Sequence, residues 1–271
     1  MKSFIHILLA LALGISLVGC GTSSQNESST PSASIETSSK TSSVIENFST
    51  SSDTVSSQPA NTTLNQGYPE EESDIIDFSS WKLALVNPKN ALPENFNPNL
   101  SLISKDFAGF EGASFDSRAI GQLHAMCNAA KADGIKLTVI SAYRTNDFQT
   151  YNFNRKVNRV MEANPVLTRE QAEKEAAKVV ARPGTSEHQL GLAVDFNSVE
   201  DSFRYTSAYT WLKAHCTEYG FILRYGDDKQ DKTEIIPEPW HYRYVGVAAA
   251  KAISEQGLCL EEFLEQNSSN N

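Results

Sequence analysis

The sequence predicts an α+β fold: a single domain in which helices flank a mainly antiparallel sheet, preceded by a disordered tether. Two observations predict it. Helical and strand-like patterns are mixed in the C-terminal part of the 271 residues without the regular βαβ repeat of a parallel sheet. Before this part lie an apolar start and a Ser/Thr-rich stretch with almost no large apolar residues. The expected order is therefore anchor, linker and domain.

The first elements of the domain are predicted from residue alternation and helical spacing. Residues 81–86 alternate as a strand should and stop at the turn signal Asn87-Pro88. Asp116 or the serine after it is expected to cap a helix, since apolar residues then recur at helical spacing as far as Gly134. A strand over residues 135–141 follows directly.

Later elements are marked by capping and stop signals. Thr168 and Gln171 have the spacing of a capping box and predict a helix to about residue 181. A helix over residues 211–219 is expected to end at Gly220. The remaining expected elements are a strand over 221–225 and closing helices over 247–256 and 258–265.

The charge balance limits the class of partner. The chain has 33 acidic against 23 basic residues, a formal net charge of -10, so a polyanion would be repelled. We therefore expect no binding to nucleic acid.

The expected oligomeric state is a monomer.

The N-terminus has the pattern of an export signal. Lys2 precedes an apolar run over residues 4–18, which is shorter than the roughly 20 residues that a transmembrane helix needs. The run ends in Leu-Val-Gly-Cys at Cys20, which resembles the lipobox of bacterial lipoproteins. An ordinary signal peptide with an unrelated cysteine is the alternative. We expect a lipid on Cys20 and a protein held at the extracytoplasmic face of the bacterial cell membrane.

These patterns divide the chain into four parts. Residues 1–19 are the expected lipoprotein signal peptide. Residues 20–72 form the lipidated cysteine and a linker too poor in apolar residues to offset its ordering entropy. Residues 73–267 are the expected catalytic domain, which is long enough for one core, and residues 268–271 a disordered tail.

Three segments of the domain concentrate polar residues that cost free energy to bury. His188 precedes a glycine turn, and the apolar strand after it contains a single carboxylate, Asp195. Pro239 fixes a backbone torsion between Glu238 and His241. The third segment is Ser-Ala-Tyr-Arg at residues 141–144, followed by Gln149.

Two histidines and one aspartate have the chemistry of a catalytic zinc site. Such sites use three protein ligands and leave a fourth position open, so His188, Asp195 and His241 are candidate ligands. A carboxylate beside the metal that does not ligate it is a candidate general base, and Glu238 fits that role. The alternative is that these residues are core polar groups satisfied by hydrogen bonds.

Together the three motifs resemble the VanY-type zinc D-alanyl-D-alanine carboxypeptidases. Ser-x-His-x-x-Gly-x-Ala-x-Asp at residues 186–195, Glu-x-x-His at 238–241 and Ser-Ala-Tyr-Arg at 141–144 occur in the family's order. The resemblance extends from about residue 81 to residue 263 and includes Gly-Phe-Ile-Leu-Arg-Tyr at 220–225.

The resemblance implies a role for each matching residue. Zinc would be bound by His188, Asp195 and His241, and Glu238 would take the proton of a zinc-bound water that attacks the peptide. Arg144 would stabilise the oxyanion and contact the substrate. Gln149 and Ser186 would bind the peptide's terminal end through hydrogen bonds. The implied substrate is the peptidoglycan stem peptide, from which the C-terminal D-alanine would be removed.

Two other functions also agree with the sequence. The related L,D-carboxypeptidases act on tetrapeptide stems, and the sequence does not separate the two bonds. A noncatalytic peptidoglycan-binding lipoprotein would be favoured if Glu238 or a ligand were missing, whereas all four residues are present.

The cysteines other than Cys20 allow two arrangements. In an oxidising compartment a disulfide between Cys216 and Cys259 is expected to staple the C-terminus, with Cys127 buried in a helix. The alternative is three free buried thiols.

Overall fold

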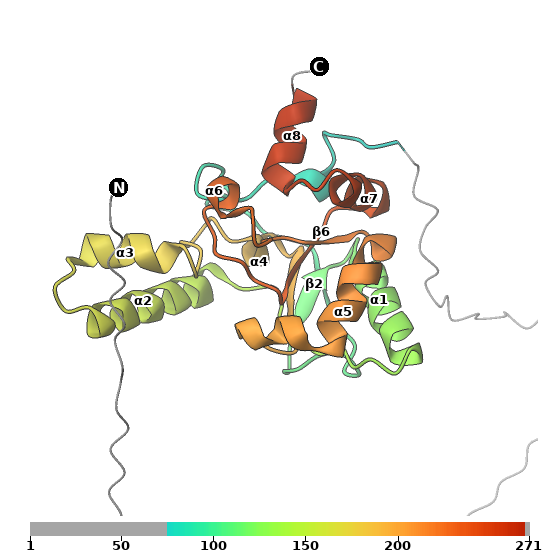
Figure 1. The fold of residues 1–271 in the computed structure, drawn as a ribbon, viewed down its shortest axis with the longest axis horizontal. Helices are drawn as coiled ribbons and strands as arrows, with labels where there is room; N and C mark the ends of the chain where they lie inside the picture. The colour runs from blue at the N-terminus through green and yellow to red at the C-terminus, as the bar shows by residue number, and fades with distance from the viewer. Residues whose placement is uncertain (1–74, 269–271) are drawn as a thin grey trace, which may run out of the picture. The chain divides into compact units, whose positions relative to one another are not determined.

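The computed structural model describes residues 75–268 (Figure 1), and they have the predicted α+β fold. A four-stranded sheet has the order β3-β4-β6-β5, and every neighbouring pair is antiparallel. Its strands are β3 (Val139–Ser141), β4 (Ala193–Phe196), β5 (Phe221–Leu223) and β6 (His241–Tyr244). The expected signal peptide, Cys20 and the linker lie outside the described residues.

Helices and a short hairpin surround this sheet. The hairpin consists of β1 (Leu100–Leu102) and β2 (Ser114–Asp116). The α-helices are α1 (Ile120–Ala132), α2 (Asn146–Ala163), α3 (Arg169–Ala177), α4 (Glu187–Leu190), α5 (Ser207–His215), α6 (Gln230–Thr233), α7 (Val247–Glu255) and α8 (Leu260–Ser268). The 3-10 helices are η1 (Trp81–Leu83), η2 (Asp201–Tyr205) and η3 (Cys216–Tyr219). Among the described residues, no helix combines the length and the apolar character needed to cross a membrane.

One face of the four-stranded sheet is apolar and packs on α1 and α5. Side chains alternate along a strand, so Val194 and Phe196 of β4 point to this face together with Tyr242 and Tyr244 of β6. They join one large core with residues of α1 and α5, among them Leu123, Met126, Trp211 and Leu212.

The opposite face is divided between a second apolar cluster and polar side chains. Ile222 of β5 packs with residues of α7 and α8, including Ala250, Ile253, Leu260 and Phe263. The alternation of β4 and β6 gives this same face Asp195, His241 and Arg243. All three are buried. The polar groups of the sheet are therefore enclosed between strands and helices.

Helices α2 and α3 form a hairpin with a small core of its own (Figure 1). The core contains Phe153, Val157, Ala172 and Ala176. The capping box predicted at Thr168 is confirmed, and α3 begins at the next residue. Helix α2 was not predicted, because its 18 residues are mostly polar and only three are buried.

Two local predictions near the start of the domain are wrong. Residues 81–86 are not a strand, since residues 81–83 form η1. The backbone carbonyls of Lys82 and Ala84 accept hydrogen bonds from the Arg243 side chain rather than from a neighbouring strand. Asp116 does not cap α1, since the residue before that helix makes no side-chain cap bond and the Asp116 carboxylate is paired with Arg118. In both cases an arginine bonds to the polar groups, backbone carbonyls or a carboxylate, that the predicted strand or helix cap would have used.

The predicted disulfide between Cys216 and Cys259 is also wrong. Both thiols are free and buried, as is Cys127. Cys216 belongs to the first core, and both cysteines border a cavity that Ile222 and Ile253 of the second apolar cluster also line. A buried free cysteine packs as a small hydrophobic side chain does. The alternative of three free buried thiols describes the structure.

Candidate metal centre

The centre of the site is a row of three residues across the sheet. Ser141 of β3 is paired in register with Asp195 of β4, and Asp195 is paired with His241 of β6. Residues that are directly opposite on antiparallel strands have neighbouring side chains on the same face. The sheet register therefore brings Asp195 and His241 together from positions 46 residues apart in the printed sequence.

His188 reaches the row from the short helix α4. Gly191 caps this helix in the left-handed conformation, with φ of 83°, and the chain then turns into β4. The ring nitrogen Nδ1 of His188 lies 2.9 Å from the carbonyl oxygen of Ala142. Because that bond requires a proton on Nδ1, the lone pair of the neutral ring is on Nε2, which lies 3.3 Å from Oδ2 of Asp195.

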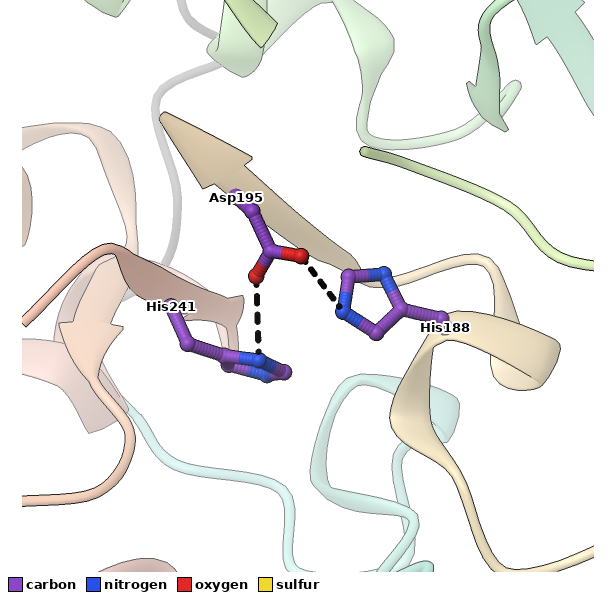
Figure 2. A group of neighbouring side chains, drawn as sticks. All are labelled: His188, Asp195 and His241. Atoms are coloured by element: carbon purple, nitrogen blue, oxygen red, sulfur yellow. Dashed lines mark ion pairs between the residues drawn. The ribbon is translucent and has the colours of Figure 1, made fainter. Parts of the chain in front are cut away.

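Asp195 lies between the two imidazoles, with one carboxylate oxygen directed at each (Figure 2). Its Oδ1 is 3.3 Å from Nδ1 of His241. The ligand atoms of the three side chains are all within 4.8 Å of one another, and all three residues are buried. Within residues 75–268 this is the group of His, Cys, Asp and Glu side chains that could hold a metal ion.

The donor set and its spacing fit zinc. Ligand atoms about 2.0–2.2 Å from a zinc ion in tetrahedral directions lie roughly 3.3–3.6 Å apart, which matches the imidazole-to-carboxylate distances here. The buried Oδ1 of Asp195 makes no hydrogen bond within the protein, so it is free to bind a cation. Two imidazoles and one carboxylate are a common zinc ligand set that leaves a fourth position open.

Burial and charge act in opposite directions on the two histidines. Burial, with the nearby positive charge of Arg144, lowers the pKa of His188 to about 4, so this ring is neutral. Burial also disfavours a charged His241, but the nearby carboxylates of Asp195, Glu187 and Glu238 outweigh it and raise the pKa of His241 above its usual value. The surroundings of His241 thus favour positive charge, which a metal cation supplies in place of a proton.

Glu238 lies beside the cluster, as its predicted role requires. It precedes β6 in the chain, and its Oε2 is 3.3 Å from Nδ1 of His241. Burial raises the pKa of the Glu238 carboxyl, although His241 opposes the shift. A raised pKa makes a carboxylate a better proton acceptor near neutral pH.

Arg144 is held over the row by three side chains. Its Nη2 donates to Oδ2 of Asp195 at 2.9 Å and to Oγ of Ser141 at 2.7 Å. Its Nη1 lies 3.5 Å from Oε1 of Gln149. The Arg144 side chain is 18% exposed to solvent, whereas the Asp195 side chain is almost fully buried. The guanidinium is thus fixed at the edge of the buried cluster, where it can still be reached.

The two predicted substrate-binding residues differ in their surroundings. Gln149 is on α2 and fully buried, and its amide nitrogen donates to the carbonyl of Ala181 at 2.7 Å. Ser186 is buried immediately before α4 and makes no cap bond with its side chain. Their roles toward substrate stay predictions.

A buried ion cluster behind His241 was missed by the sequence reasoning. Glu187, which follows Ser186, pairs with Arg224 of the segment after β5 and Arg243 of β6. The signal available in the sequence was an arginine within each of two apolar strand patterns, since a buried arginine needs a carboxylate.

Comparisons with known proteins agree with this geometry. The family model described as VanY, D-alanyl-D-alanine carboxypeptidase, matches residues 112–247. A D-alanyl-D-alanine carboxypeptidase of Enterococcus faecalis is 42% identical over 188 residues, which cover 69% of this chain and 67% of the relative. A crystal structure of a variant of the vancomycin-resistance D,D-pentapeptidase VanY, in complex with Zn(II), is 43% identical with a TM-score of 0.60 and covers 68% of this chain and 99% of the other.

A second solved structure belongs to a carboxypeptidase of different bond preference. The LdcB LD-carboxypeptidase is 37% identical with a TM-score of 0.60, and the match covers 68% of this chain and 86% of the other. The family match contains all three residues of the cluster, Glu238 and Arg144. The chain belongs to the VanY family of zinc-dependent D-alanyl-D-alanine carboxypeptidases.

Proposed function

We propose that this protein is a zinc carboxypeptidase that removes the C-terminal D-alanine from peptidoglycan stem peptides. The observation that carries the proposal is the cluster of His188, Asp195 and His241 with Glu238 beside it. The similar D-alanyl-D-alanine carboxypeptidase of Enterococcus faecalis supports the bond, and the Zn(II) complex of the related pentapeptidase supports the metal. The presence of the complete set argues against a noncatalytic peptidoglycan-binding protein.

The proposed ligands would hold the metal through one atom of each side chain. When bound, zinc lowers the pKa of a coordinated water to about 7 and polarises the scissile carbonyl. His188 is oriented for this by its bond to the Ala142 carbonyl, which leaves Nε2 directed at the cluster.

Glu238 is the proposed proton carrier. Its carboxylate takes a proton from the attacking water and returns it to the leaving D-alanine amine. Its position 3.3 Å from Nδ1 of His241, beside the proposed ligands, supports this role. Burial supports it as well, because a carboxyl with a raised pKa is a stronger base.

Arg144 is the proposed stabiliser of negative charge. As the water attacks, charge develops on the carbonyl oxygen, and a fixed guanidinium beside that oxygen lowers the barrier. The bonds from Arg144 to Ser141 and Asp195 support the role, because a donor held in place needs no reorganisation during the reaction. Gln149 and Ser186 are the proposed contacts to the peptide's free carboxylate.

The cellular place of this activity is also part of the proposal. The lipobox-like sequence at Cys20 supports a lipid anchor at the extracytoplasmic face of the membrane. The Ser/Thr-rich residues 20–72 would then let the domain at 73–267 reach the cell wall from that anchor.

A second candidate bond is the one between the third residue and the D-alanine of a tetrapeptide stem. The similarity to the LdcB LD-carboxypeptidase favours it. The two bonds differ in the configuration of the residue before the terminal D-alanine, so only the substrate distinguishes them.

The decisive experiment offers the two substrates separately. The purified protein with stoichiometric zinc is incubated with a muramyl pentapeptide or with the matching tetrapeptide, and the products are weighed by mass spectrometry. Loss of one alanine from the pentapeptide supports the proposal, and loss from the tetrapeptide alone supports the L,D bond. The Glu238→Gln variant is the matched control for a contaminating peptidase. Failure to shorten either peptide would contradict both assignments.

A further inference from the structure

Behind His241, on the side away from Asp195, lies the buried carboxylate of Glu187. Nε of Arg224 and Nη1 of Arg243 both donate to its Oε1, at 2.8 Å each. The other oxygen, Oε2, makes no hydrogen bond within the protein and lies 3.6 Å from Nε2 of His241. That Nε2 also makes no hydrogen bond. Two buried polar atoms without hydrogen bonds therefore face one another.

The two arginines that hold Glu187 are themselves fixed from the other side. Arg224 makes two parallel bonds to Glu261 of α8, at 2.7 and 2.8 Å. Arg243 donates to the carbonyls of Lys82 and Ala84, at 3.0 and 2.9 Å. Arg224, Arg243 and Glu187 have side chains that are fully buried. Because both arginines are anchored to distant parts of the chain, the carboxylate of Glu187 has a set position relative to His241.

Glu187 faces the nitrogen of His241 that is directed away from the cluster. The opposite nitrogen, Nδ1, lies 3.3 Å from Oδ1 of Asp195 and 3.3 Å from Oε2 of Glu238. A neutral imidazole has one N–H and one lone pair, and a metal needs the lone pair. A proton on Nδ1 would be attracted by both carboxylates and would occupy the position of the metal bond. An acceptor at Nε2 is required to draw the proton to the other side of the ring.

We propose that Glu187 is a positioning residue that accepts a hydrogen bond from Nε2–H of His241 and so leaves Nδ1 free for the metal. This inference rests on the metal site of the proposed function. The gap of 3.6 Å closes to hydrogen-bond length with a shift of about half an ångström. His188 has the reverse arrangement, since Nδ1 lies against the Ala142 carbonyl and Nε2 faces Asp195. The two histidines would therefore bind the metal through different ring nitrogens.

The first test compares Glu187→Gln with Glu261→Gln in the full chain. Each variant removes one negative charge from the same cluster, and each affects a partner of Arg224, but only Glu187 faces His241. In Glu187→Gln the arginines keep the amide oxygen as their acceptor, so the NH2 group faces His241 and cannot accept a proton. The measurement is the zinc dissociation constant, determined by competition with a chelator.

The expected result separates positioning from general stability. Both variants lower the unfolding temperature of the zinc-free protein, because both leave buried charges with fewer partners. The zinc dissociation constant rises about 10- to 100-fold in Glu187→Gln, as is typical when the partner of a metal-binding histidine is lost. In Glu261→Gln it changes less than about 3-fold, since no group that contacts His241 is altered. Equal zinc dissociation constants in the two variants would overturn the inference.

The second test uses the unaltered protein and does not depend on the folding of a variant. The 15N chemical shifts of the imidazoles in the zinc-bound protein report which ring nitrogen carries the proton. We expect the proton on Nε2 in His241 and on Nδ1 in His188. A proton on Nδ1 of His241 would contradict the role of Glu187 while leaving the proposed function intact, whereas a protein that binds no zinc at all would contradict the proposed function itself.

Discussion

Arg144 and Asp195 form a salt bridge of 2.9 Å at the edge of the candidate metal centre. The same carboxylate oxygen, Oδ2, faces Nε2 of His188 at 3.3 Å. Burial alone would raise the pKa of Asp195, but His188 and Arg144 are among the groups that hold it well below its usual range. Arg144 thus pairs with a proposed metal ligand. It is also partly exposed to solvent, on the side from which a substrate would approach.

Replacement of Arg144 tests its proposed action on the carbonyl oxygen. We expect Arg144→Ala to lower kcat by about 100-fold or more, as loss of a fixed oxyanion donor does, with zinc still stoichiometric because all three ligands remain. Arg144→Lys should recover part of the rate, since lysine supplies the charge but not the planar fork that spans Ser141 and Asp195. Kinetics and elemental analysis are measured on the same samples. If Arg144→Ala kept more than a tenth of the rate, the role would belong to another group.

Glu238→Gln and His241→Ala should separate proton transfer from metal binding. The amide has nearly the shape of the carboxylate but accepts no proton, so we expect a loss of roughly 100- to 10,000-fold in D-alanine release with zinc retained. His241→Ala should lose zinc and activity together. Zinc stoichiometry and D-alanine release are measured side by side. If Glu238→Gln kept more than about a tenth of wild-type activity, the loss would be smaller than removal of a general base produces. That result would contradict the role of Glu238.

The three buried thiols should be present but unreactive. Burial raises the pKa of Cys127 and of Cys216 to about 12 and that of Cys259 to about 11. At pH 8 only about one thiol in ten thousand is a thiolate when its pKa is 12. In the Cys20→Ala chain, alkylation without reductant should be slow in the folded state and should add three groups after unfolding. A single added group after unfolding would reveal a disulfide.

A glycine before β5 should tolerate no side chain. Gly220 has φ of 79°, and a Cβ there would lie 2.8 Å from Cε2 of Tyr244 and 2.9 Å from the carbonyl carbon of Gly246. Gly112 has the same φ with nothing within 4 Å, so it is the matched control. We expect Gly112→Ala to cost about 1–2 kcal/mol from backbone conformation, and Gly220→Ala to cost about 1–3 kcal/mol more from overpacking. Urea unfolding measures both, and equal losses would contradict the steric argument.

The proposed anchor is tested by removing its thiol. We expect the Cys20→Ala protein to leave the membrane fraction, because the apolar run at residues 4–18 is shorter than a spanning helix. The wild-type protein should stay in the membrane pellet after a high-salt wash, since a lipid anchor does not depend on charge. Retention of Cys20→Ala in that pellet would contradict the lipobox interpretation.

The sequence by itself determined where several helices begin or end and which residues make up the candidate site. Gly220 and the capping box at Thr168 act within a few residues, so their patterns predict where a helix ends or begins whatever lies around them. The proposed ligands and Glu238 stand out because an isolated carboxylate or imidazole in an apolar strand needs a partner. Such requirements are local and can be read from the printed residues.

The tertiary structure alone decided which partners those residues meet. Helix α2 is stabilised by its contact with α3 through side chains such as Phe153, which outweighs a polar sequence. Residues 81–86 form no strand because their carbonyls bond to Arg243, which lies in β6. The charge that surrounds His241 depends on Glu187. The partners of Glu187, Arg224 and Arg243, lie in other segments of the chain. A buried charge is tolerated only with a partner, and the partner is chosen by the folded chain rather than by its neighbours in sequence.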